Sequence, residues 1–239
     1  MAFQPVLRRR LYQQVAERIE TMIRDGELTE GEALPAEREL MERFAVGRPA
    51  IREALLSLRQ KGLVVLANGE RARVSHPDAD QLIDALSGAA AVYLAKEEGV
   101  RQFQAARRLF EAATARQAAR IAGAQDIARM EAALAANRAA RGDTARFETT
   151  DVAFHLELVR TVGNPLLTGV HQALVGWLIE QRSVSLTARG AEASAFAAHE
   201  RIFAAIAAHD PDRAEQEMQK HLDAVAAYYW RRARLARTP

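Results

Sequence analysis

The spacing of apolar residues predicts three short helices in the first 60 residues. One apolar stripe predicts a helix over residues 11–25. A second helix begins at Pro35, has two glutamates in its first turn and runs to about residue 44. A tight turn separates it from a third helix that begins at about Arg48. The core-facing positions of this third helix follow i, i+3, i+4 and i+7 and are Ile51, Ala54, Leu55 and Leu58.

The pattern then changes to two short strands. Gly62 ends the third helix, and the apolar runs 63–66 and 71–74 are joined through Asn68–Gly69, a strong hairpin signal. A helix, a tight turn, a second helix and a hairpin form a winged helix-turn-helix, which places one helix in the major groove of DNA. The alternative to DNA binding is a small helical domain whose charged residues are simply solvated. The arginines that lie off the apolar stripe, where DNA could meet them, favour DNA binding: Arg48, Arg52 and Arg59.

The rest of the chain has helical periodicity and no strand pattern. A helix at 79–94 and a break at 96–99 precede six alanine-rich helices with short connections, which predicts an antiparallel bundle. These six helices are expected at 100–122, 124–141, 143–162, 164–188, 192–209 and 211–235. The fold class is therefore mostly α, with a DNA-binding domain at 1–78, a linker helix at 79–99 and a helical metal- and effector-binding domain at 100–239.

Composition narrows the class of protein. The 239 residues include no cysteine, so disulfides and thiolate chemistry are excluded, as fits a reducing cytoplasm. The chain has no signal-peptide pattern and no apolar run of about 18 residues, so we expect a cytoplasmic protein without membrane spans. The net charge is only +2, and the whole excess falls within residues 1–75. Base reading and dimeric binding must therefore supply much of any DNA affinity.

Four polar residues on apolar helix faces predict a metal site. Asp151 and His155 are one turn apart on one predicted helix, and His199 and His221 lie on the apolar faces of two others. Buried without partners, they would together cost several kcal/mol. One divalent ion per chain would satisfy all four, and three imidazoles with a carboxylate suit zinc best, with nickel, manganese or iron as alternatives. The competing interpretation is that each histidine is a hydrogen-bonded core residue.

Several motifs carry a resemblance to a known family. The segment LPAERELMERFAVGRPAIREAL with the NGERARV hairpin resembles the winged-helix domain of the GntR superfamily. RRLFEAATARQAARIA, DVAFH and VGNPLL resemble the all-helical FCD effector domain of its FadR subgroup. NGERARVSHPDAD, GNPLL, GWLI and AAHDPDRAEQEMQKHL are most similar to the branch that represses sialic acid (N-acetylneuraminate) catabolic genes. The resemblance covers nearly the whole chain.

The resemblance implies a homodimeric regulator that binds operator DNA and senses a carboxylate-bearing metabolite near its metal. Contacts to DNA would come from Arg38, Arg48, Arg52 and the wing tip at Gly69. The family commonly has serine where this chain has Ala36, so a hydroxyl that could donate to a DNA phosphate is missing here. The family also commonly has Ser-Arg where this chain has Gly47–Arg48, so the arginine is kept.

The arginine that the resemblance assigns to the effector is Arg107. Its planar fork suits bidentate capture of a carboxylate. Arg107 also lies four residues before Glu111, so an ordinary helical salt bridge is the alternative.

Two other functional classes share some of these features. A metal-dependent hydrolase with an accessory DNA-binding module would use the same ligands, but no general base or oxyanion donor is recognisable beside them. An architectural DNA-binding protein with a structural metal would show no ligand effect on operator binding. A metabolite-sensing repressor, without enzymatic activity, accounts for every feature.

Overall fold

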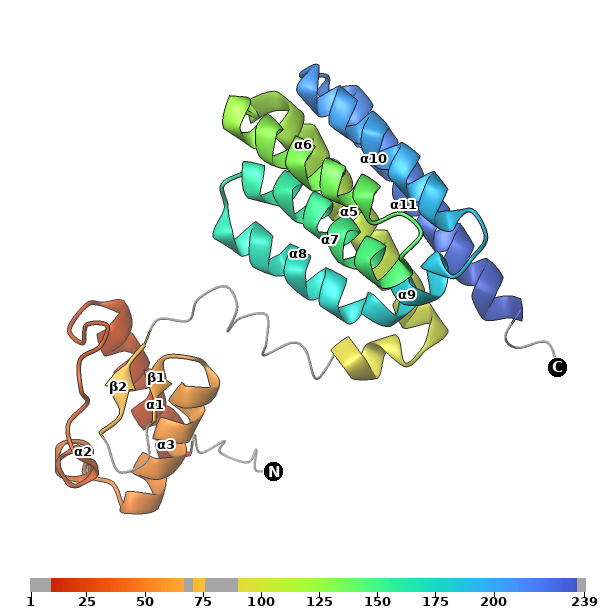
Figure 1. Cartoon of the computed structure of the whole chain (residues 1–239). Helices are drawn as coiled ribbons and strands as arrows, with labels where there is room; N and C mark the ends of the chain where they lie inside the picture. The colour runs from red at the N-terminus through yellow and green to blue at the C-terminus, as the bar shows by residue number, and fades with distance from the viewer. Residues whose placement is uncertain (1–9, 67–70, 76–89, 236–239) are drawn as a thin grey trace, which may run out of the picture. The chain divides into compact units, whose positions relative to one another are not determined.

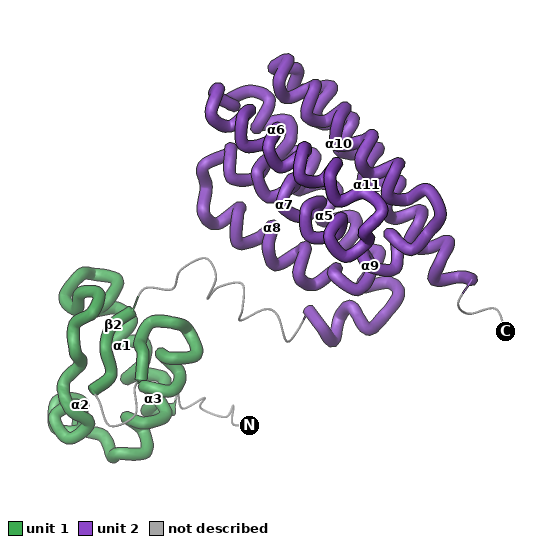
Figure 2. Tube along the Cα trace, viewed as in Figure 1, with its two compact units in different colours: residues 1–85 green, residues 86–239 purple. Residues whose placement is uncertain are grey.

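The computed structural model describes residues 10–66, 71–75 and 90–235. The chain divides into two compact units, Met1–Ala85 and Leu86–Pro239 (Figure 2). The wing tip at Gly69 and most of the predicted 79–94 helix lie outside the described residues. The end of that helix is described, and it is helical over 90–94.

The described part of unit 1 forms three helices and a two-stranded antiparallel sheet (Figure 1). The helices are α1 (Leu11–Arg24), α2 (Glu37–Phe44) and α3 (Arg48–Gln60). Strand β1 (Val64–Val65) pairs with β2 (Arg73–Val74), with Val64 opposite Val74. The observed order is the helix, turn, helix and hairpin that the sequence predicts, and the apolar stripes of α1 and α3 are buried in one core.

The turn between α2 and α3 is set by local chemistry. Ala45 closes α2 in the left-handed region with φ of 51°, and its N–H donates to the carbonyl of Met41. Gly47 caps α3, and Pro49 occupies the first turn, where its missing N–H costs nothing. Helix α2 begins at Glu37 rather than at Pro35, because the preceding residues Ala33 and Leu34 are extended and bonded to the wing backbone.

Unit 2 is helical throughout its described residues. Its helices in chain order are α5 (Glu97–Ile121), α6 (Ala124–Ala139), α7 (Thr144–Thr161), α8 (Pro165–Trp177), α9 (Ile179–Leu186), α10 (Ala191–Ala207) and α11 (Pro211–Leu235). The long helix α11 packs along both α5 and α10, and α7 packs between α5, α6 and α8 (Figure 1). None of the described helices is long and apolar enough to cross a membrane.

Two predicted boundaries in unit 2 are wrong. The predicted helix 164–188 is interrupted at Leu178, which separates α8 from α9 two residues after Gly176. Arg182 and Ser185 are the buried residues of α9. The predicted break at 96–99 ends earlier, because α5 already begins at Glu97.

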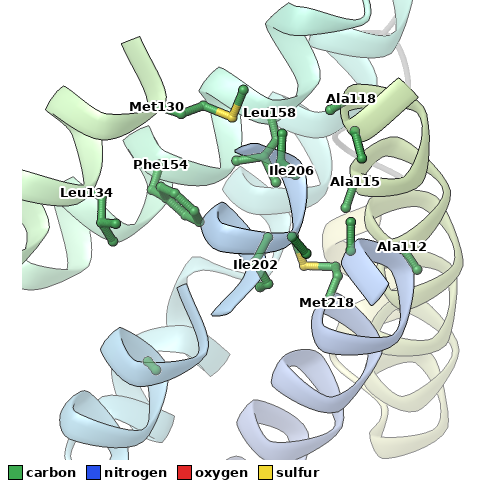
Figure 3. Packing of buried hydrophobic residues seen from close by; sticks show 14 of the residues in the cluster. Ala112, Ala115, Ala118, Met130, Leu134, Phe154, Leu158, Ile202, Ile206 and Met218 are labelled. Atoms are coloured by element: carbon green, nitrogen blue, oxygen red, sulfur yellow. The ribbon is translucent and has the colours of Figure 1, made fainter. Parts of the chain in front are cut away.

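The unit 2 core is built from small residues on α5 and large ones opposite. Four alanines of α5 are almost fully buried, which lets neighbouring helices approach closely. Figure 3 shows side chains from α5, α7, α10 and α11 gathered in the same interior. The large apolar side chains that complete it include Met130, Phe147, Phe154, Leu158, Ile202, Ile206 and Met218. This core holds α7, α10 and α11 in fixed register, and the predicted metal ligands lie on these three helices.

Candidate functional site

The four predicted metal ligands meet inside unit 2. Asp151 and His155 come from α7, His199 from α10 and His221 from α11, and one ligand atom from each lies within 4.8 Å of the others. All four residues are at most 3% exposed. The helical spacing of i and i+4 on α7 places Asp151 and His155 on the same face. The structure therefore brings together all four residues that the sequence predicts as metal ligands.

His155 is oriented by a buried carboxylate that the metal prediction did not include. Its Nδ1 lies 2.5 Å from Oε2 of Glu111, and Glu111 Oε1 accepts a bond from Arg107 Nε at 2.6 Å. Burial alone would raise the pKa of Glu111, but the charge of Arg107 and the contact with His155 outweigh it and hold that pKa well below its usual range. Glu111 is therefore a carboxylate that faces His155 Nδ1, and a neutral His155 ring that donates from Nδ1 carries its lone pair on Nε2.

His199 is oriented in the same way by an amide. Its Nδ1 lies 3.0 Å from Oδ1 of Asn137, a fully buried residue. Asn137 Nδ2 donates to the hydroxyl of Thr150 at 3.0 Å, and that hydroxyl donates onward to a backbone carbonyl. These bonds fix which end of the amide faces His199, so His199 donates from Nδ1 and its Nε2 carries a lone pair.

The two Nε2 atoms face each other, and this arrangement fits a cation. Nε2 of His155 and Nε2 of His199 are 3.2 Å apart. Burial, followed by the charges of neighbouring imidazoles, lowers the pKa of both His199 and His221 well below the usual value, so a proton is disfavoured there. Asp151 is buried beside them, with Oδ1 3.4 Å from His199 Nε2 and Oδ2 in contact with the Arg182 guanidinium. These residues fit a divalent metal with three nitrogens and one oxygen, the donor set that zinc prefers.

A pocket with two arginines adjoins the four ligands. Arg107 and Arg182 both line it together with Asp151, His221, Ser185, Ser194 and Tyr228. Arg182 Nη2 contacts Asp151 Oδ2, and Arg182 Nε has no hydrogen bond among the described residues. Burial, and then the charge of Arg107, lowers the pKa of Arg182 to about 9. The salt bridge from Arg107 to Glu111 is present as well, so the two interpretations of Arg107 are compatible.

Sequence reasoning missed Arg182 and Asn137, although both leave a signal. Asn137 follows Met130 and Leu134 at helical spacing, and Arg182 follows the buried Leu178 by four residues. Each is thus a polar residue on an apolar face. His171 is a further buried histidine, and burial lowers its pKa to about 4.

The DNA-contacting residues expected in unit 1 are exposed where they are described. Arg48 and Arg52 on α3 are about 60% exposed and both pair with Glu37 at the start of α2. Arg38 is 86% exposed and pairs with Glu42 of the same helix at 3.3 Å. Gly69 lies outside the described residues. The apolar face of α3 is buried and its arginine face is open, as a groove-reading helix requires.

Comparisons with known proteins agree with both units. A family model described as "Bacterial regulatory proteins, gntR family" matches residues 11–74, and the FCD domain model matches residues 102–224. The "HTH-type transcriptional repressor NanR" of Edwardsiella tarda is 44% identical over 225 residues, covering 93% of this chain and 86% of that protein. The protein of the same name from Escherichia coli K12 is 43% identical over 225 residues.

A solved structure shares the fold as well. Streptococcus agalactiae GntR superposes with a TM-score of 0.59 at 25% identity, covering 90% of this chain and 99% of that one. The relatives are named as regulators and repressors, not as enzymes. Since both domain models match in chain order and the relatives extend over nearly its whole length, the chain belongs to the GntR family of bacterial transcriptional regulators, in the group that carries an FCD domain.

Proposed function

We propose that this regulator is a cytoplasmic, homodimeric repressor that binds operator DNA through α3, holds one divalent metal in unit 2 and responds there to a carboxylate-bearing metabolite. The observation that carries the proposal is the pair of facing imidazoles. His155 and His199 each have Nδ1 occupied by an acceptor and turn Nε2 toward the other at 3.2 Å. With both rings neutral, the two Nε2 lone pairs would repel unless a cation is bound by both.

Asp151, His155, His199 and His221 would hold the metal, with zinc preferred over nickel, manganese or iron. The bound metal would supply a Lewis-acid position for one oxygen of the ligand. Glu111 and Asn137 keep the two imidazoles in the tautomer that a metal needs, because each accepts a hydrogen bond from Nδ1.

The pocket beside these residues favours an acidic ligand. Arg107 is 6% exposed and is held by Glu111, which leaves its outer amino groups available to a carboxylate. Arg182 presents a second buried guanidinium from α9. The ligand class is an acidic sugar or a small hydroxy- or keto-carboxylate, and the branch-level resemblance makes sialic acid the leading candidate.

Ligand binding would weaken DNA binding by altering the separation of the two α3 helices in the dimer. The segment 79–94 joins the effector domain to the DNA-binding domain and would transmit the change. A coupling of about 1–3 kcal/mol, or about 5–150-fold in DNA affinity, is typical of such switches. By linkage, operator DNA must weaken ligand binding by the same factor.

The test combines metal analysis, calorimetry and operator binding. The purified chain should contain close to one divalent ion, and N-acetylneuraminate should bind to it and release operator DNA. Arg107→Ala should lose ligand binding while keeping its metal. Ligand binding that leaves operator affinity unchanged would contradict the switch, and an absence of metal after zinc reconstitution would contradict the metal site.

Recognition of DNA is tested separately. Arg48→Ala and Arg52→Ala should each cost about 1–3 kcal/mol of binding free energy to a two-half-site operator and should relax base preference. A variant that bound and discriminated operators as the wild type does would show that the recognition helix is misassigned.

A further inference from the structure

One carboxylate holds two of the three arginines of α3. Arg52 Nε donates to Oε1 and to Oε2 of Glu37, each at 3.2 Å, and Arg48 Nε lies 3.6 Å from Oε2. Glu37 is the first residue of α2, and the two arginines lie one turn apart on α3. The carboxylate therefore bridges the two helices of the helix-turn-helix on the side where the arginines are exposed.

We infer that Glu37 is a positioning residue that sets the DNA specificity of this regulator by acting through Arg48 and Arg52. The inference rests on the proposed role of these arginines in reading base edges. It assigns to Glu37 two effects of opposite sign, one on operator DNA and one on DNA of unrelated sequence.

The first effect comes from the geometry of the Arg52 guanidinium. Both hydrogen bonds to Glu37 engage Nε, so they do not require the outer amino groups Nη1 and Nη2. A guanine presents O6 and N7 to such a pair of amino groups. Holding Nε restricts a long side chain that otherwise has many rotamers, so less entropy is lost when the base is bound. Glu37 should therefore strengthen binding to the correct site.

The second effect comes from charge. The Glu37 side chain is 35% exposed beside arginines that are about 60% exposed, so its negative charge lies on the surface that would meet the phosphates. Binding to unrelated DNA depends almost wholly on phosphate contacts and gains nothing from a fixed guanidinium. Glu37 should therefore weaken binding to incorrect sites.

A matched residue separates this role from a general effect of charge. Glu39 lies in the same first turn of α2, and it pairs with Arg43 of its own helix at 2.5 Å rather than with α3. Glu37→Gln and Glu39→Gln remove the same charge from the same helix terminus. Only Glu37→Gln removes the ion pairs with Arg48 and Arg52.

The experiment measures the affinity of the full-length chain for two duplexes. One is an operator selected by the wild-type protein from a randomised pool, and the other has the same composition in scrambled order. Glu37→Gln should bind the operator about 3–10-fold more weakly, as expected for a side chain that must be ordered on binding. It should bind the scrambled duplex about 2–5-fold more tightly, as expected for one exposed charge. Glu39→Gln should leave the ratio of the two affinities unchanged within about twofold.

A second substitution tests the route of action. In an Arg52→Ala background, Glu37→Gln should change the affinity ratio much less than it does in the wild type. The thermal midpoint of each variant confirms that it is folded. If Glu37→Gln shifts both affinities in the same direction as Glu39→Gln does, the inference is overturned. If Arg52→Ala itself leaves discrimination intact, the proposed reading role of Arg52 fails, and the inference fails with it.

Discussion

The two units of this protein use polar side chains in opposite ways. In unit 1 the arginines proposed to contact DNA form ion pairs at the surface, as Arg38 does with Glu42, and such pairs contribute about 0–1 kcal/mol to stability. In unit 2 Glu111 and Asn137 are at most 2% exposed, and each forms a hydrogen bond with Nδ1 of a buried histidine, Glu111 with His155 and Asn137 with His199. Substitutions in unit 1 should therefore report on binding alone, whereas in unit 2 function and stability should change together.

The largest expected effect tests whether the metal ties function to stability in unit 2. His221→Ala should deplete the bound metal and lower the thermal midpoint, because the His221 ring lies against both His199 and His155. A metal present at about a thousand times its Kd stabilises the folded state by about 4 kcal/mol. Elemental analysis and calorimetry measure both quantities. Lys220→Ala, an exposed neighbour on α11, should leave both unchanged. Equal metal content in the two variants would refute this assignment.

Acid should reveal the next largest effect. The pKa of His171 is lowered from 6.5 to about 4 because the ring is buried, so the folded state binds no proton there until well below the pKa of the unfolded chain. The stability from neutral His171 is complete above about pH 6.5 and is lost as pH falls toward 4, at up to about 1.4 kcal/mol per pH unit. Unfolding of wild type and His171→Phe across this window should show a shallower pH dependence in the variant. Parallel curves would contradict it.

A smaller loss should follow from disturbing the amide beside His199. Asn137→Leu leaves the His199 Nδ1–H without its acceptor, which should cost about 1–3 kcal/mol of unfolding free energy. Loss of such a partner typically weakens metal binding by about 10–100-fold. Denaturant unfolding and zinc competition measure the two effects. Thr149→Ala, an exposed position on α7, is the control, and wild-type metal affinity in Asn137→Leu would exclude an orienting role.

The smallest effect is expected at the surface of unit 1. Arg38→Ala should change unfolding free energy by no more than about 0.5 kcal/mol, because Arg38 is 86% exposed and pairs only with Glu42 in the described structure. It should weaken binding to all duplexes alike and reduce the salt slope by about 1, as loss of one phosphate contact does. A large fall in the thermal midpoint of Arg38→Ala would contradict the expectation that substitutions in unit 1 affect binding and not stability.

Local patterns allowed most of the fold and the ligand cluster to be predicted. The pair Asp151 and His155 is visible because i, i+4 spacing fixes a shared helix face, and the α2–α3 turn is visible through Gly47 and Pro49. The break at Leu178 is not predicted, although Gly176 lies two residues before it, because a single glycine within an apolar helical pattern is often tolerated. The contacts of Arg182 with Asp151 and of Asn137 with His199 join helices far apart in sequence, and periodicity along one helix carries no information about such pairs.

Glu111 also constrains how this protein can evolve. One of its oxygens contacts Arg107, which lines the pocket. The other contacts His155, which is one of the four proposed metal ligands. Any lineage that replaced Arg107 to recognise a different metabolite would leave an unpaired buried anion beside His155. Residues on α9, α10 and α11 that line the same pocket, such as Ser185, Ser194 and Tyr228, are free of that constraint. New effector specificities should therefore arise on these three helices, while the α5 side of the pocket changes slowly.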